Sequence, residues 1–237
     1  MSLLDDVLEA GGGADRLQGL NRFTAHLSLK GGLPRSKGKD GFIHEVVVEG
    51  SIREPELQIT GFANPDRRAL LSRDRVAIER SDGVLLAERL NPVSSFAKHD
   101  ELMPWDDLHF AYYSGCFIWS CFAQQFQLIA QDVQITELPT KHERSDGWRS
   151  LKIALPTRLA VFAGEQIAHF DGLAMLRCVE YSPTLATRKR LVEDTSAHQR
   201  FSNVVIPTLR QGRSSDDHQV RTRHSDLEVE IFDAAFS

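Results

Sequence analysis

Apolar and polar residues alternate along many short stretches of the chain, which is the pattern of β-strands that bury one face. Every second residue of 23–29, beginning with Phe23, is apolar, and residues 42–48 repeat this alternation. Further strands are expected at 57–60, 191–200, 204–210 and 227–236. The pattern therefore predicts a mainly β protein.

Asp-Gly pairs separate several of these alternating stretches. Glycine adopts a positive φ at little cost, so Asp-Gly between two such stretches is a strong hairpin signal. The three pairs are Asp82-Gly83, Asp146-Gly147 and Asp171-Gly172, and they predict hairpins joining 76–79 to 84–88, 133–138 to 148–155, and 167–170 to 173–181. Neighbouring strands should then be antiparallel and joined mostly as a meander. A sheet of about ten strands rarely stays flat, so it should curl toward an unclosed barrel.

Residues 105–123 break the alternation and read as a helix. Pro104 precedes the segment, and Asp106 and Asp107 lie in its first turn, where the helix dipole favours acidic residues. Apolar residues cover nearly every face of this helix, so we expect it to be buried. A shorter helical cap, broken by the glycines at 11–13, is expected at the N-terminus.

Together these elements predict an α+β fold that is mainly β. A strongly curved antiparallel sheet would wrap around the buried aromatic helix. The sequence has no linker rich enough in Pro, Ser or Gly to separate two domains, so residues 1–237 should form a single domain.

Composition narrows the class of protein further. Of the 237 residues, 41% are hydrophobic and 26% are charged, which excludes a mainly disordered chain. The formal net charge of -5 gives no electrostatic basis for nucleic-acid binding. We therefore expect no nucleic-acid partner, while the oligomeric state is left open.

Cysteine usage and the N-terminal sequence indicate the compartment. The three cysteines, Cys116, Cys121 and Cys178, are an odd number without the spacing of a disulfide framework or a zinc site. The N-terminal residues do not follow the pattern of a signal peptide, and the sequence contains no apolar stretch of membrane-spanning length. These features predict a cytoplasmic protein without a transmembrane segment.

Several short motifs resemble known families. The segment 9–20 (EAGGGADRLQGL), the Asp-Gly hairpins, the strand 201–208 and the closing segment 227–234 are similar to the lipoprotein-carrier (LolA-like) group of unclosed barrels. The segment Trp-Asp-Asp-Leu-His at 105–109, followed by an aromatic helix, also resembles a widespread bacterial family of uncharacterised function. The resemblance implies a curved antiparallel sheet wrapped around helices. It also implies an apolar cavity that accepts acyl chains or another hydrophobic molecule.

The aromatic helix carries the candidate ligand-binding residues. Aromatic side chains crowd this segment, and they suit either the wall of a pocket or the packing of a core. We predict that a hydrophobic molecule, aromatic or lipid-like, binds in an apolar cavity between the curved sheet and residues 105–123. The expected ligand-binding residues are Trp105, Tyr112, Tyr113, Cys116, Phe117, Trp119 and Ser120.

An enzyme is the alternative interpretation of the same segment. Asp106 and His109 are three residues apart, and His109 and Tyr113 are four apart, so all three lie on one helical face. A carboxylate, an imidazole and a phenol in this order suit acid-base catalysis by a lyase, isomerase or hydrolase. The three residues equally suit a helix cap, a backbone hydrogen bond and core packing. A third possibility is a protein-interaction module that uses an edge or face of the sheet.

The sequence gives little sign of metal or cofactor binding. Four histidines, His26, His44, His169 and His198, lie in predicted strands, but no pair shows HxH or HExxH spacing. The run of glycines at 11–13 follows a helix, whereas a phosphate-binding loop follows a strand. We therefore predict neither a metal nor a cofactor.

Overall fold

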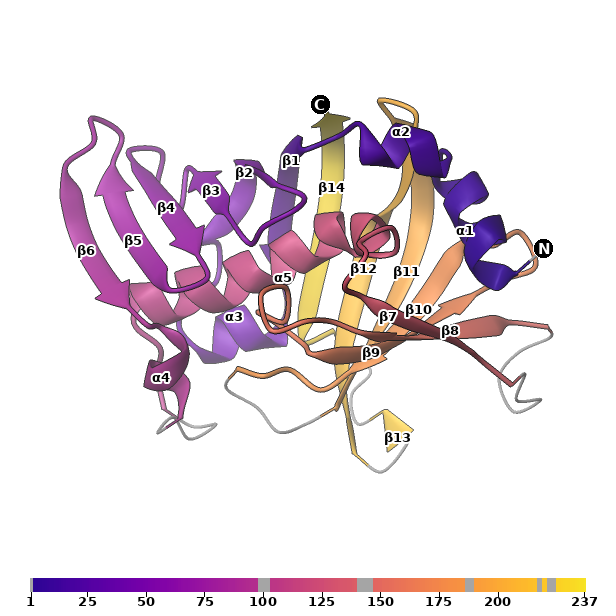
Figure 1. The fold of residues 1–237 in the computed structure, drawn as a ribbon. Helices are drawn as coiled ribbons and strands as arrows, with labels where there is room; N and C mark the ends of the chain where they lie inside the picture. The colour runs from indigo at the N-terminus through magenta and orange to yellow at the C-terminus, as the bar shows by residue number, and fades with distance from the viewer. Residues whose placement is uncertain (1, 98–102, 140–146, 186–189, 217–218, 221–224) are drawn as a thin grey trace.

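A computed structural model describes residues 2–97, 103–139, 147–185, 190–216, 219–220 and 225–237. Figure 1 shows one long helix on the concave side of an arched sheet, with two short N-terminal helices beside one end of the arch. The helices are α1 (Leu3–Gly11), α2 (Ala14–Gln18), α3 (Gly32–Ser36), α4 (Val93–Phe96) and α5 (Asp107–Gln127). Within the described residues, no helix combines the length and apolarity needed to cross a bilayer.

The described strands form one antiparallel sheet that does not close. The first six strands are β1 (Arg22–Lys30), β2 (Ile43–Ser51), β3 (Leu57–Thr60), β4 (Arg67–Ser72), β5 (Arg75–Arg80) and β6 (Leu85–Leu90). The others are β7 (Gln134–Leu138), β8 (Arg149–Ala154), β9 (Glu165–Phe170), β10 (Leu176–Tyr181), β11 (Arg190–Phe201), β12 (Val204–Asp216), β13 (Gln219–Val220) and β14 (Leu227–Phe236).

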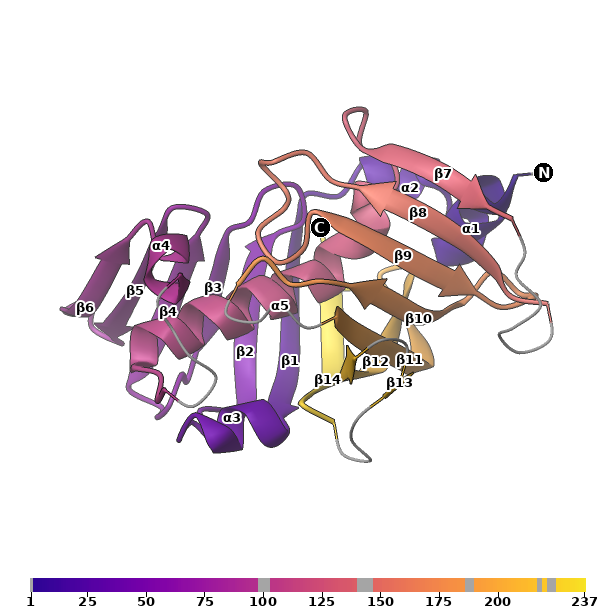
Figure 2. The ribbon, with the colours of Figure 1, turned by 90° about the horizontal axis from the view of Figure 1, so that it is seen from below.

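The order of the strands explains the position of α5. Neighbours run β6-β5-β4-β3-β2-β1-β14-β12-β11-β10-β9-β8-β7, and β13 pairs with β12. The pairing of β1 with β14 joins the two halves, and β6 and β7 form the two open edges. Because α5 follows β6 and precedes β7 in sequence, it crosses the concave side from one edge toward the other (Figure 2).

The predicted strands and hairpins are largely confirmed, with two differences. The described sheet has fourteen strands where about ten were expected; the expected strands did not include β4 or β13, and β13 is only two residues long. Gly83 has φ 89° in the hairpin from β5 to β6, as expected. In the turn from β9 to β10, however, Ala174 has a positive φ of 57°. In the remaining pair, Asp146-Gly147, Asp146 lies outside the described residues.

The long helix is confirmed with shifted ends. It begins at Asp107 and continues to Gln127, beyond the predicted end at Ala123. Its aromatic side chains are buried against both halves of the sheet; Phe122 stacks on Phe23 with ring centroids 4.2 Å apart. Because the apolar residues surround the helix, it has no polar face to present to water.

The N-terminal helices form the predicted cap. Ser2 and Asp5 make a capping box at the start of α1, which satisfies backbone N–H groups that lack helical partners. The loop expected between β1 and β2 contains the short helix α3. At the end of α1, Gly12 has φ 126°, and a Cβ there would lie 2.3 Å from the Asn203 carbonyl oxygen. Only glycine allows α1 to approach the β11–β12 turn this closely.

Candidate ligand-binding site

An apolar cavity, here called the α1 cavity, lies between α1, the C-terminal half of α5 and the strands β8 to β12. Its free space is about 550 Å³ including the part open to solvent, of which about 50 Å³ is wide enough for the centre of a water molecule. Most of the lining is apolar and includes Val7, Cys121, Leu128, Ile153, Ala168 and Phe170. Such a lining suits an apolar molecule.

A few polar side chains also reach the α1 cavity. They belong to Gln124 and Gln125 of α5 and to His198 of β11. Burial and the nearby Arg177 guanidinium lower the pKa of His198, which favours its neutral form. An apolar wall with a few polar groups is the usual composition of a small-molecule site.

A second cavity, here called the glutamine cavity, lies farther along the concave side and shares Gln124 with the α1 cavity. About 20 Å³ of it is wide enough for the centre of a water molecule, within a free space of about 360 Å³. Its polar lining consists of Ser120, Gln124, Gln127, Gln166, Tyr181, Glu193 and Arg210, and its apolar lining includes Trp119 and Phe162. The two cavities therefore differ in polarity on either side of one glutamine.

A buried ion pair forms the polar centre of the glutamine cavity. Arg210 Nε and Glu193 Oε1 lie 2.6 Å apart, and the two side chains are only 2% and 3% exposed. Burial lowers the pKa of Arg210, but the neighbouring Cys121, Glu193 and Tyr181 raise it more, so the guanidinium remains charged. A buried charge without a partner is costly, and this pair keeps the site electrically balanced.

Hydrogen bonds extend from this pair to both α5 and the sheet. Tyr181 Oη donates to Glu193 Oε2 at 2.9 Å, and Arg210 Nη2 donates to Gln124 Oε1 at 2.5 Å. Gln124 Nε2 in turn donates to Gln166 Oε1, and Gln166 Nε2 to Gln127 Oε1, each at 3.4 Å. Burial raises the pKa of Tyr181 well above its ordinary value, so its hydroxyl keeps the proton that it donates.

The sequence interpretation did not identify this polar network. The signal was present, because Leu191, Glu193 and Thr195 share the inward face of β11, where alternation predicts apolar residues. A charged residue at an inward position requires a partner, and Arg210 on β12 provides it. Arg210 lies opposite Thr195 in the strand pairing and so reaches Glu193 diagonally.

The predicted ligand-binding residues lie in two groups. Trp119 and Ser120 line the glutamine cavity. The other five are packed among aromatic rings toward the start of α5 and are Trp105, Tyr112, Tyr113, Cys116 and Phe117. Tyr113, for example, lies with its ring centroid 4.9 Å from that of Trp105 and 5.2 Å from that of Phe162.

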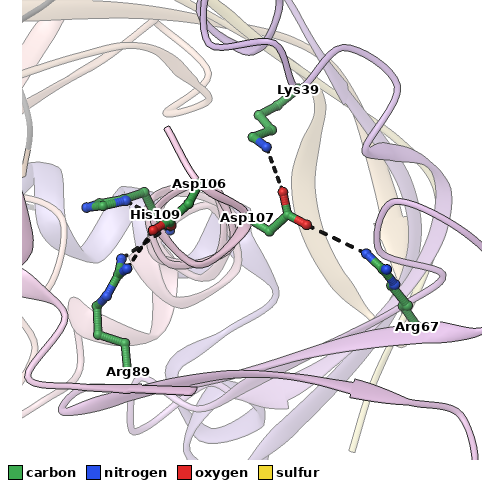
Figure 3. Close-up of polar contacts among 6 residues, drawn as sticks. All are labelled: Lys39, Arg67, Arg89, Asp106, Asp107 and His109. Atoms are coloured by element: carbon green, nitrogen blue, oxygen red, sulfur yellow. Dashed lines mark hydrogen bonds and ion pairs between the residues drawn. The ribbon is translucent and has the colours of Figure 1, made fainter. Parts of the chain in front are cut away.

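The predicted catalytic residues lie together at the start of α5. Asp106 is the N-cap residue; its Oδ1 accepts hydrogen bonds from the His109 backbone N–H and from His109 Nδ1, both at 2.8 Å. Arg89 of β6 donates to the other oxygen, Oδ2, at 2.6 Å (Figure 3). Partial burial raises the pKa of Asp106, but these partners lower it to about 2.

Asp107 forms ion pairs on the opposite side of the start of α5. Lys39 Nζ lies 2.6 Å from Asp107 Oδ1, and Arg67 Nη1 lies 3.6 Å from Oδ2 (Figure 3). The two adjacent carboxylates therefore connect the start of α5 to β4, to β6 and to the loop before β2. This arrangement fixes the position of the helix relative to the first half of the sheet.

Tyr113, the third predicted catalytic residue, is 1% exposed. Burial raises the pKa of its hydroxyl, so it is a weak acid in this environment. The Phe96 ring lies 5.1 Å from the His109 ring and 6.4 Å from the Tyr113 ring, between centroids. The three residues are thus brought near one another, in a tightly packed aromatic environment.

The four strand histidines lie on different strands. His26 packs against Phe232, His44 is exposed, and His198 lines the α1 cavity. His169 belongs to the one group of possible metal ligands found among the described residues, together with Cys178 and Glu180. In this group His169 hydrogen-bonds to Ser150 and Glu180, and Arg190 forms an ion pair with Glu180. His169 and Glu180 are thus already engaged in hydrogen bonds and an ion pair.

Comparison with known proteins places this architecture among solved folds. No protein-family model matches the sequence, and no curated protein matches it significantly. A domain described as an outer membrane lipoprotein-sorting protein, from Vibrio parahaemolyticus, superposes with a TM-score of 0.54 at 12% identity. It covers 99% of this chain and 92% of the other.

Two further structures match over nearly the whole chain. A LolA superfamily protein from Nitrosomonas europaea matches with a TM-score of 0.51 at 8% identity, covering 99% of this chain and 94% of the other. The chain has a LolA-like fold. A DUF1329 family protein from Desulfovibrio piger shares it, with a TM-score of 0.51 at 8% identity over 99% and 92% of the two chains. The LolA-like resemblance read from the sequence is confirmed at the level of the fold.

Proposed function

We propose that the protein binds a hydrophobic small molecule, aromatic or lipid-like, in the α1 cavity. The main support is the cavity itself, an apolar space enclosed by α1, α5 and the strands from β8 to β12. A hydrophobic molecule would gain the free energy of leaving water there, at about 25 cal/mol per Å² of apolar surface buried. The LolA-like fold and the description of one matching structure as a lipoprotein-sorting protein agree with such a cargo.

Uptake of a chain-like ligand requires the α1 cavity to widen, and α1 is the element placed to move. It contributes Val7, Ala10 and Gly11 to the lining. At its N-terminal end, the Leu3 N–H donates to Glu137 at 3.2 Å and Asp6 pairs with Arg149 at 3.0 Å. These partly exposed polar contacts are individually weak, so displacing α1 disturbs less of the core than displacing α5 would.

A cavity-filling variant tests the proposal. Ala168 is buried and lines the α1 cavity, so Ala168→Leu should weaken binding of a neutral fluorescent probe such as N-phenyl-1-naphthylamine at least about tenfold. Ala235→Leu, on the exposed face of β14, is the control and should bind normally. Native mass spectrometry of the purified protein should also reveal a bound hydrophobic compound. Failure to find one, together with equal probe binding by both variants, would contradict the proposal.

An acid-base enzyme is the second candidate. The 2.8 Å contact between Asp106 and His109 Nδ1 favours it, because a carboxylate that orients an imidazole is a common catalytic pairing. The compound recovered by native mass spectrometry also separates the two candidates. Incubation with the protein leaves a cargo unchanged in mass and structure, whereas an enzyme converts it.

The location of the protein in the cell belongs to the same proposal. Cys116, Cys121 and Cys178 are all buried, and none of them forms a disulfide, which suits a reducing compartment. We therefore keep the cytoplasm as the proposed location, where the ligand would be taken up.

A further inference from the structure

The two cavities differ in polarity on either side of Gln124. The α1 cavity is lined mostly by apolar side chains, whereas the glutamine cavity adds three glutamines and a buried ion pair to apolar residues such as Trp119 and Phe162. A molecule that extends from the first into the second would present an apolar body and a polar end. The size and charge of the glutamine cavity therefore limit which polar end the ligand can carry.

The size of the glutamine cavity limits this polar end. A cavity needs roughly 10–15 Å³ of space for probe centres to hold one water molecule. The glutamine cavity offers about 20 Å³, which is room for one water-sized group such as a hydroxyl, and a primary amide needs the cavity to widen, as the α1 cavity must for the chain. Gln124, Gln127 and Gln166 provide both donors and acceptors around it, so either kind of neutral group finds partners.

The ion pair determines the charge that the site accepts. Arg210 is already neutralised by Glu193, and both side chains are almost completely buried. A carboxylate entering beside them would place a second negative charge near Glu193 with no additional cation to balance it, and an ammonium would do the reverse next to Arg210. Uncompensated charge in a buried site is strongly unfavourable.

We propose that the protein selects amphipathic ligands with an apolar chain and a small uncharged head, a hydroxyl or a primary amide, over carboxylates and amines with the same chain. This inference rests on the proposed function and specifies its ligand class. The Glu193–Arg210 pair acts as a charge filter, and the glutamines hold the head by hydrogen bonds.

A set of ligands with one chain and different heads tests the inference on the unmodified protein. Displacement of N-phenyl-1-naphthylamine is measured with decanol, decanamide, decanoate and decylamine at neutral pH. Decanol and decanamide should bind at least about tenfold more tightly than the two charged ligands. If neither the probe nor any of the four ligands binds, the proposed function fails; if the probe binds but none of the four displaces it, only the inference fails. If the charged ligands bind as tightly as the neutral ones, the inference fails and the proposed function stands.

Variants of the ion pair should reverse the selection. Glu193→Gln keeps an acceptor for Tyr181 but leaves Arg210 without its counter-charge, so decanoate should become the preferred ligand. Arg210→Gln leaves Glu193 unbalanced and should favour decylamine. Asp194→Asn removes a carboxylate from the next residue of β11, which is exposed and pairs with Arg213, and should keep the original order. An unchanged order in a folded Glu193→Gln protein would overturn the charge filter. If that variant does not fold, the ligand series on the unmodified protein decides.

Discussion

Asp106 could act either as an acid-base group or as a helix cap. Its place in the first turn indicates the start of a helix, whereas its spacing to His109 suggests an acid-base group. In the structure its carboxylate caps α5, accepts hydrogen bonds from His109 and pairs with Arg89. Each contact favours the charged form of Asp106, and together they stabilise the start of the helix.

The capping role predicts a measurable loss of stability. Asp106→Ala should lower the free energy of unfolding by about 1 kcal/mol, the usual value of an N-cap. Asp106→Asn retains a capping side chain and should lose less, because only the charge interactions with Arg89 and His109 are removed. Chemical unfolding of the three proteins at neutral pH tests this order; equal stabilities of wild type and Asp106→Ala would contradict it.

The pH dependence of the same residue follows from its lowered pKa. The folded-state pKa of about 2 lies below the ordinary value of 3.8, so the charge of Asp106 stabilises the fold fully above 3.8. This contribution is lost as the pH falls through about 2. The stability difference between wild type and Asp106→Asn should therefore be constant near neutral pH and shrink under acidic conditions, as followed by unfolding across a pH series. A difference that grows on acidification would refute this assignment.

At the scale of the element, α1 covers one end of the molecule, and its backbone packs closely against the β11–β12 turn. A side chain at position 11 would overlap the Gln125 side chain, which has a flexible end and can move. At position 12 it would meet the backbone of Asn203, which cannot move without disturbing the β11–β12 turn. The close packing of α1 against the β11–β12 turn therefore depends on Gly12 in particular.

Gly12→Ala should loosen α1 from the sheet. The positive φ and the close carbonyl together cost on the order of 1–3 kcal/mol. Hydrogen exchange should show faster exchange in α1 while the amides of α5 remain protected. Gly38→Ala is a suitable control, because it also has a positive φ but no atom near the added Cβ. Equal protection of α1 in the two variants would show that close packing at Gly12 is unimportant.

At the scale of the whole molecule, α5 and the β1–β14 pairing hold the two halves together. Phe122 lies at this junction, stacked on Phe23 of β1 and 6.4 Å from the Phe236 ring of β14. Its burial is complete, so its contacts contribute to both halves at once. Such a shared core should make the two halves unfold together.

Phe122→Ala tests this coupling. Removal of a buried phenylalanine ring typically costs about 3–5 kcal/mol. Hydrogen exchange should show that strands of both halves, for example β4 and β9, lose protection by similar amounts. Loss confined to β4 alone would indicate that the halves are independent.

Local patterns determined most of the elements. The period of two in residues 23–29 and the continuous apolar character of residues 105–123 depend on near neighbours, so strand and helix could be recognised from sequence. The Asp-Gly pairs likewise placed the hairpin between β5 and β6. The spacing of Asp106 and His109 also predicts that they lie near each other, although the structure makes the contact through the N-cap position of Asp106.

Tertiary structure decided which distant residues meet. Nothing in the local pattern indicates that β14 pairs with β1, or that this pairing leaves β6 and β7 as edges joined by α5. The Glu193–Arg210 pair and its link to Gln124 depend on strand register and on where α5 crosses the sheet. Periodicity specifies which face of an element is buried, but the partner of a buried charge is fixed only when the faces of separate elements come into contact.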